Sequence, residues 1–112
     1  HDAWAHIDDK PVIFVYNEGG CDVARRWSDA SNGEWYVVLK IFPGHQNCEY
    51  RPDSFHQYGV GLEDGTVHNR GHSFVLSPGF WRADTDIPMV PRVDVPTFCN
   101  NTKRMVESNE PW

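Results

Sequence analysis

The stretch PVIFVYNEGGCDVARRWSDASNGEWYVVLKIF, residues 11–42, decides the fold. Its first six residues are apolar and largely β-branched, which is typical of a strand covered on both faces. Residues 21–31 place apolar side chains at helical spacing, with charged side chains on the opposite side. Residues 34–42 return to the pattern of a buried strand. A strand, a helix and a strand in this order predict a βαβ unit with parallel strands and a right-handed crossover.

The remainder of the chain carries two shorter strand patterns and one more helix. Residues 54–58 and 73–77 are predicted to be strands, and residues 98–108 a helix capped by Thr97. About four parallel strands amount to half of a (β/α)8 barrel, and a complete barrel needs ~200 or more residues. We therefore expect an α/β fold, a partial (β/α)8 (TIM-like) barrel with few helices, in which residues 1–112 are a fragment of one barrel domain.

Charge and composition narrow the classes of partner. The formal net charge is −6 at pH 7 and no Lys/Arg cluster is present, which argues against a nucleic-acid partner. No run approaches the ~18 consecutive apolar residues of a membrane-spanning helix, so no membrane partner is expected. Aromatic residues make up 13% of the chain, with five Trp. Such rings suit sugar-binding clefts and ordinary protein cores alike.

The ends of the predicted strands hold the candidate site. In α/β barrels the reactive groups lie at the carboxyl ends of the strands, and here those ends carry hydrogen-bonding or aromatic residues, whereas the strand starts are plain turns. The asymmetry favours a binding rim, although most loops are polar. The predicted sugar contacts are Tyr16, Asn17, Lys40, His56, Gln57, Tyr58, Phe80 and Trp81.

Several of these positions have a second interpretation. Lys40 lies inside an apolar run, so its amine either reaches solvent or finds a partner, and an inward-facing amine would suit a sugar site. His56 and Tyr58 share one face of a strand, where they contact either a sugar or the backbone of the core. Glu18 is either catalytic or a solvated loop acid. No close carboxylate pair stands at a strand end, so the catalytic residues of a glycosidase stay unassigned.

Cysteine and asparagine positions bear on the compartment. The spacing of Cys21, Cys48 and Cys99 matches no zinc ribbon or CxxC motif. The chain therefore has either one disulfide and one free thiol or three buried thiols. Residues 100–102, Asn-Asn-Thr, have the form of an N-glycosylation acceptor, although so short a motif also occurs by chance.

Metal binding is a minor alternative, and no cofactor is expected. His68 and His72 have i,i+4 spacing, but the residues between them are poor helix formers. His1, as a free N-terminus, could hold copper together with a second histidine, as in lytic polysaccharide monooxygenases. Those proteins are β-sandwiches, which the predicted βαβ unit fits badly.

The segments at residues 10–17, 35–40, 54–59 and 77–80 resemble the middle of the glycoside hydrolase family 99 group, the endo-α-mannosidases and endo-mannanases. The resemblance implies a barrel glycosidase acting on α-linked, mannan-like polysaccharide. In that group the catalytic carboxylates lie on the next strand, so the chain alone would be inactive. Tyr58 and the turn at residues 77–80 would line the sugar cleft. Cys21 and Cys48 would lie on adjacent loops of the same rim, close enough for a disulfide.

These observations give one favoured function and two alternatives. The favoured function is part of a secreted glycoside hydrolase, extracellular or periplasmic, that contributes the wall of a cleft for an oligo- or polysaccharide. The alternatives are a non-catalytic carbohydrate-binding domain and a copper-dependent oxidase that uses His1. One departure from the resemblance is that residues 59–71 are too few for a full crossover helix.

Overall fold

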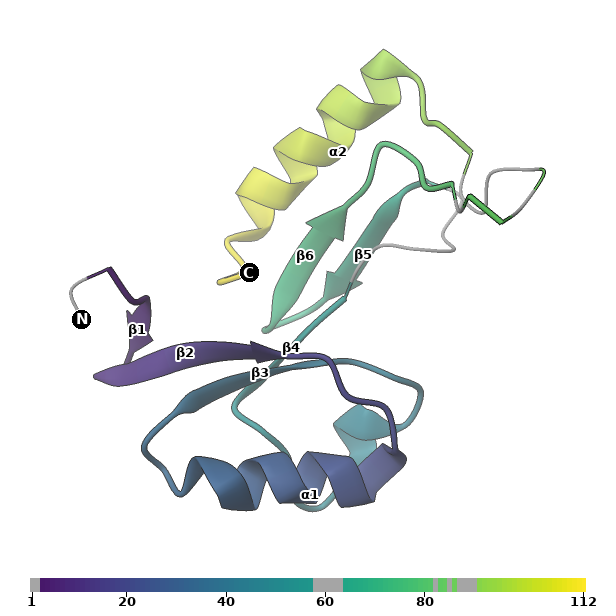
Figure 1. Cartoon of the computed structure of the whole chain (residues 1–112). Coiled ribbons are helices and arrows are strands. Elements are labelled where there is room, and N and C mark those ends of the chain that lie inside the picture. The colour runs from purple at the N-terminus through teal and green to yellow at the C-terminus, as the bar shows by residue number, and fades with distance from the viewer. Residues whose placement is uncertain (1–2, 58–63, 82, 85, 87–90) are drawn as a thin grey trace. The chain divides into compact units, whose positions relative to one another are not determined.

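The computed structural model describes residues 3–57, 64–81, 83–84, 86 and 91–112. The chain divides into two compact units, His1–Phe55 and His56–Trp112. Figure 1 traces both of them along the chain. Each unit has its own secondary structure and is described by itself.

The first unit is built on a βαβ arrangement. The strands β1 (His6–Ile7), β2 (Lys10–Val15), β3 (Tyr36–Lys40) and β4 (Ser54–His56) form one sheet in that order, and β4 ends on the first residue of the second unit. Helix α1 (Gly20–Ser31) connects β2 to β3, which are parallel, and a short 3₁₀ helix, η1 (His45–Asn47), follows β3. The predicted βαβ unit is therefore confirmed.

Alternation along the strands builds the core of the first unit. Helix α1 covers one face of this sheet (Figure 1). Successive residues of a strand face opposite ways, so every second residue of β2 and β3 contributes its side chain to that face. The buried residues of this core are Val15, Ala24, Val37, Leu39, Cys48 and Phe55. The core thus joins the helix, the strands β2, β3 and β4, and the segment that follows η1.

The second unit is a β-hairpin packed against a helix. Strands β5 (Thr66–Asn69) and β6 (Ser73–Leu76) pair antiparallel, and α2 (Val95–Ser108) packs on β6. Asp94 caps α2 by accepting hydrogen bonds from the backbone N–H (2.8 Å) and hydroxyl (2.9 Å) of Thr97. The predicted helix is therefore present but begins earlier, with Asp94 rather than Thr97 as its cap.

The prediction of a partial (β/α)8 barrel is wrong. The strands form two separate sheets, and both β1–β2 and β5–β6 are antiparallel. The reason lies in the connection between β5 and β6, which is only residues 70–72. A parallel pair needs a crossover of a dozen or more residues, whereas a short turn allows only a hairpin. The segment at residues 73–77, predicted as a parallel strand, therefore pairs antiparallel with residues 66–69, for which no strand was predicted.

Neither of the two α-helices that the structure describes is long and apolar enough to cross a membrane.

Candidate functional site

The carboxyl ends of β2 and β3 form the candidate site. Val15 pairs with Leu39 in the parallel register, so the residues that follow them, Tyr16 just after β2 and Lys40 at the end of β3, lie at neighbouring strand ends. Ligands of open α/β sheets bind at the carboxyl ends of parallel strands. We call the group of Tyr16, Lys40, Phe42 and His45 the strand-end site.

Three rings of the strand-end site pack edge to face. The ring centroids of Tyr16 and Phe42 lie 5.7 Å apart, and those of Phe42 and His45 lie 5.5 Å apart. This geometry is the favourable one for aromatic pairs. Tyr16 nevertheless stays 59% exposed. Phe42 thus supports the tyrosine from one side and leaves much of its ring open to solvent.

Lys40 is an unusual lysine because only 9% of it is exposed. Its Nζ lies 3.8 Å from the centre of the Phe42 ring and donates a hydrogen bond to the carbonyl oxygen of Ile41 at 3.1 Å. Burial lowers the pKa of Lys40, and the charge of Glu18 opposes part of this effect. The sequence leaves open whether the amine reaches solvent or finds a partner within the protein. The structure shows the second arrangement.

His45 lies at the base of the site and was not among the predicted contacts. It is fully buried, and neither ring nitrogen has a hydrogen-bond partner. Leaving buried polar atoms unpaired costs about 1–3 kcal/mol, so this position needs support from its surroundings. Gly44, with φ 91°, turns the chain into η1 and brings the histidine inward. The Pro-Gly-His sequence after the strand was the signal that could have indicated this turn.

A disulfide lies next to the strand-end site in the chain and links the segments that follow β2 and β3. It joins Cys21, in the first turn of α1, to Cys48, which follows η1, with their Cα atoms 5.4 Å apart. This is the pairing that the family resemblance implies. Cys99 is free and exposed on α2. The disulfide connects the start of α1, which directly follows the loop after β2, with the segment after β3 that carries Phe42 and His45.

The structure distributes the predicted contacts unequally. Tyr16 and Lys40 come together through Phe42, and Asn17 follows Tyr16 as an exposed residue. His56 and Gln57 are half-buried at the start of the second unit. Two contacts, Phe80 and Trp81, are exposed residues of the second unit. Two further candidates, Tyr58 and the N-terminal His1, lie outside the described residues.

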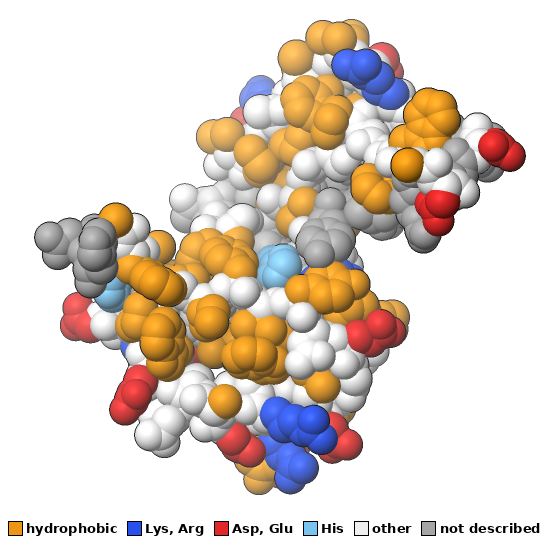
Figure 2. Space-filling view, in the orientation of Figure 1, with side chains coloured by type: hydrophobic (Ala, Val, Ile, Leu, Met, Phe, Trp, Pro, Cys, Tyr) orange, Lys and Arg blue, Asp and Glu red, His pale blue; other side chains and the backbone are white. Residues whose placement is uncertain are grey.

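Hydrophobic side chains gather over the strands of the first unit (Figure 2). The large exposed ones of this unit are Trp4, Phe14, Tyr16, Trp35 and Tyr50. Phe14 and Tyr16 are two positions apart, so they project to the same side of the chain as it leaves β2. This side continues the aromatic surface of the strand-end site along the strand.

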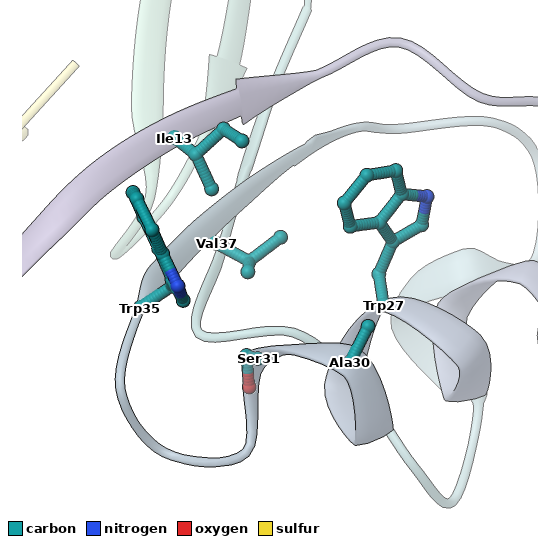
Figure 3. Close-up of a pocket in the computed structure, with 6 residues that line it drawn as sticks. All are labelled: Ile13, Trp27, Ala30, Ser31, Trp35 and Val37. Carbon is teal, nitrogen blue, oxygen red and sulfur yellow. The ribbon is translucent and has the colours of Figure 1, made fainter.

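A separate cavity of about 120 Å³ lies between α1 and the sheet (Figure 3). Trp27 from the helix and Trp35, the residue before β3, flank it, with Ile13 and Val37 between them. The hydroxyl of Ser31 at its edge already donates to the carbonyl oxygen of Ser28 at 2.8 Å. The cavity is therefore suited to apolar packing, and the strand-end site is the better match for a polar ligand.

Among the residues that the structure describes, no group of three or more His, Cys, Asp or Glu side chains is placed to hold a metal ion. His68 instead forms a hydrogen bond with Glu110, with 2.7 Å between Nε2 and Oε1.

Comparisons with known protein families, with curated proteins and with solved structures found no match.

Proposed function

We propose that this chain binds the sugar residues of an oligo- or polysaccharide at the strand-end site. The observation that carries the proposal is that an exposed tyrosine ring and a desolvated lysine amine both rest on Phe42. A sugar ring has an apolar C–H face and a polar rim of hydroxyl groups. An aromatic face beside a fixed hydrogen-bond donor complements both.

Preorganisation supports the proposal. Phe42 restrains Tyr16 before any ligand arrives, so little side-chain entropy is lost when a sugar stacks on it. The hydrogen bond from Lys40 to the carbonyl oxygen of Ile41 and the contact of its amine with the Phe42 ring hold the amine in place before a sugar binds. The exposed side chains of Asn17 and Glu18 follow Tyr16 and supply further donors and acceptors to a sugar.

The proposal is binding rather than hydrolysis. Most glycosidases need two carboxylates that flank the scissile bond, and Glu18 is the acid whose charge acts on Lys40. The family resemblance supplies the ligand class, an α-linked mannan. In this proposal the chain contributes a sugar-binding wall to a secreted glycoside hydrolase.

The test is a calorimetric titration of the chain with an α-linked manno-oligosaccharide, with a β-linked gluco-oligosaccharide for comparison. Tyr16→Ala removes the stacking ring and raises Kd roughly two- to tenfold, as expected for the ~0.5–1.5 kcal/mol of an aromatic contact. Tyr16→Phe keeps the ring and retains most of the affinity. Tyr50→Ala is the matched control, because Tyr50 is a tyrosine of similar exposure, 54%, outside the site.

Lys40 gives a second, independent readout. The lowered pKa of Lys40 means that its amine loses its proton at a lower pH than an ordinary lysine. Affinity is therefore expected to fall as the pH rises through that lowered value, and Lys40→Met removes this pH dependence. Equal affinities of the wild type and of Tyr16→Ala, or no saturable binding of either sugar, would overturn the proposal.

A further inference from the structure

Helix α2 displays an acceptor sequence on its exposed side. Residues 100–102 read Asn-Asn-Thr, the form N-x-T in which x is not proline, and no other N-x-S or N-x-T triplet occurs in the sequence. The strand-end site makes no use of this segment, which belongs to the second unit. Its two asparagines differ sharply in their surroundings.

Asn101 is buried and its side chain is hydrogen-bonded within the protein. It is only 3% exposed, its Nδ2 donates to the carbonyl oxygen of Asp64 at 2.8 Å, and its Oδ1 accepts from Arg104 at 3.0 Å. The neighbouring Asn100 is rotated by about 100° around the helix axis and is exposed. The helix therefore turns the acceptor asparagine outward and the middle residue of the triplet inward.

The exposed side of α2 has room for a bulky group. The residues near Asn100 on this side, Pro96, Cys99 and Lys103, are exposed as well. A glycan on Asn100 would consequently displace none of the contacts that hold α2 against β6. In the folded helix the Thr102 hydroxyl donates to the carbonyl oxygen of Phe98 at 2.9 Å, so a transferase would read this threonine before the helix forms.

We propose that Asn100 is an N-glycosylation site. The donor is an oligosaccharide carried on a lipid diphosphate. The amide nitrogen of Asn100 forms a bond to C1 of the first sugar, the bond from C1 to the diphosphate oxygen breaks, and the lipid diphosphate leaves. One amide proton is lost to the transferase. The modification takes place in the secretory pathway, whose oxidising lumen also permits disulfides, and the disulfide between Cys21 and Cys48 is compatible with that compartment.

The test expresses the whole chain behind a cleavable signal peptide in a eukaryotic secretory host. The wild type and Thr102→Ser, which keeps the acceptor motif, are expected to shift to lower mobility on a gel. Asn100→Gln and Thr102→Val, which remove the motif, are expected to run as the unmodified chain. N-glycosidase treatment abolishes the shift and leaves Asp at position 100, which peptide mass spectrometry reads directly.

Medium and cell lysate are both analysed, because sugar transfer precedes folding and a variant that fails to fold still reports its modification. A wild-type chain that enters the secretory pathway and stays unmodified in both fractions overturns the proposal. A mobility shift that persists in Asn100→Gln overturns it as well.

Discussion

Removal of the Cys21–Cys48 disulfide should destabilise the first unit by an amount that follows from the loop it closes. The two cysteines are 27 positions apart. Without the cross-link the unfolded chain gains entropy worth about 3.5 kcal/mol at 25 °C for a loop of this length. The variant is Cys21→Ser with Cys48→Ala, because Cys48 is buried in the core and alanine keeps that position apolar. Cys99→Ser is the common background and prevents thiol exchange.

Urea unfolding followed by tryptophan fluorescence measures this loss, since Trp4, Trp27 and Trp35 report on the first unit. Hydrogen exchange of peptides from β2, α1 and β3 then localises it. Peptides from β5 and β6 are the internal control, because the disulfide lies within the first unit. A loss of less than about 1 kcal/mol would refute the loop-entropy reasoning, and so would a loss of protection confined to the hairpin.

Two further substitutions test local features of the fold. Gly19→Ala should destabilise the chain more than Gly20→Ala in urea unfolding. Both glycines have positive φ, a conformation that destabilises a non-glycine residue by about 1–2 kcal/mol. Only at Gly19 would the new Cβ also clash with the side chain of Val23. Glu110→Gln should remove an acid-sensitive contact of the hairpin. The hydrogen bond from His68 lowers the pKa of Glu110, so this stabilisation is present above the ordinary glutamate pKa and is lost as the pH falls through the lowered value. Hydrogen exchange of the β5–β6 peptides across the acidic range is expected to show that loss in the wild type alone.

The parts of the fold that sequence could predict are those with a strong local signal. The residues of β2, α1 and β3 form continuous apolar or amphipathic runs, and these runs fix both the elements and their parallel order. The hairpin lacked such a signal. Residues 66–69 are mostly polar and lie among turn residues, and their pairing depends on β6 and on the reversal at residues 70–72.

The same distinction holds for the candidate site. Tyr16 and Lys40 were predictable, because a parallel register places the ends of β2 and β3 together. Phe42 and His45 were not, since their positions depend on how the loop after β3 turns at Gly44. The periodicity of a strand says nothing about a loop whose path is set by a single glycine and a cross-link.

The cross-link and the site are physically related. His45 without hydrogen-bond partners and Lys40 without free access to water are both unfavourable in isolation. Cys48 donates its backbone N–H to the carbonyl oxygen of His45 at 3.2 Å, and its sulfur is bound to the first turn of α1. The covalent bond therefore holds the loop that carries the histidine against the helix that follows Tyr16. Since polar groups desolvated in this way persist only where the surrounding structure enforces them, the cross-link lies where the strand-end site needs the most support.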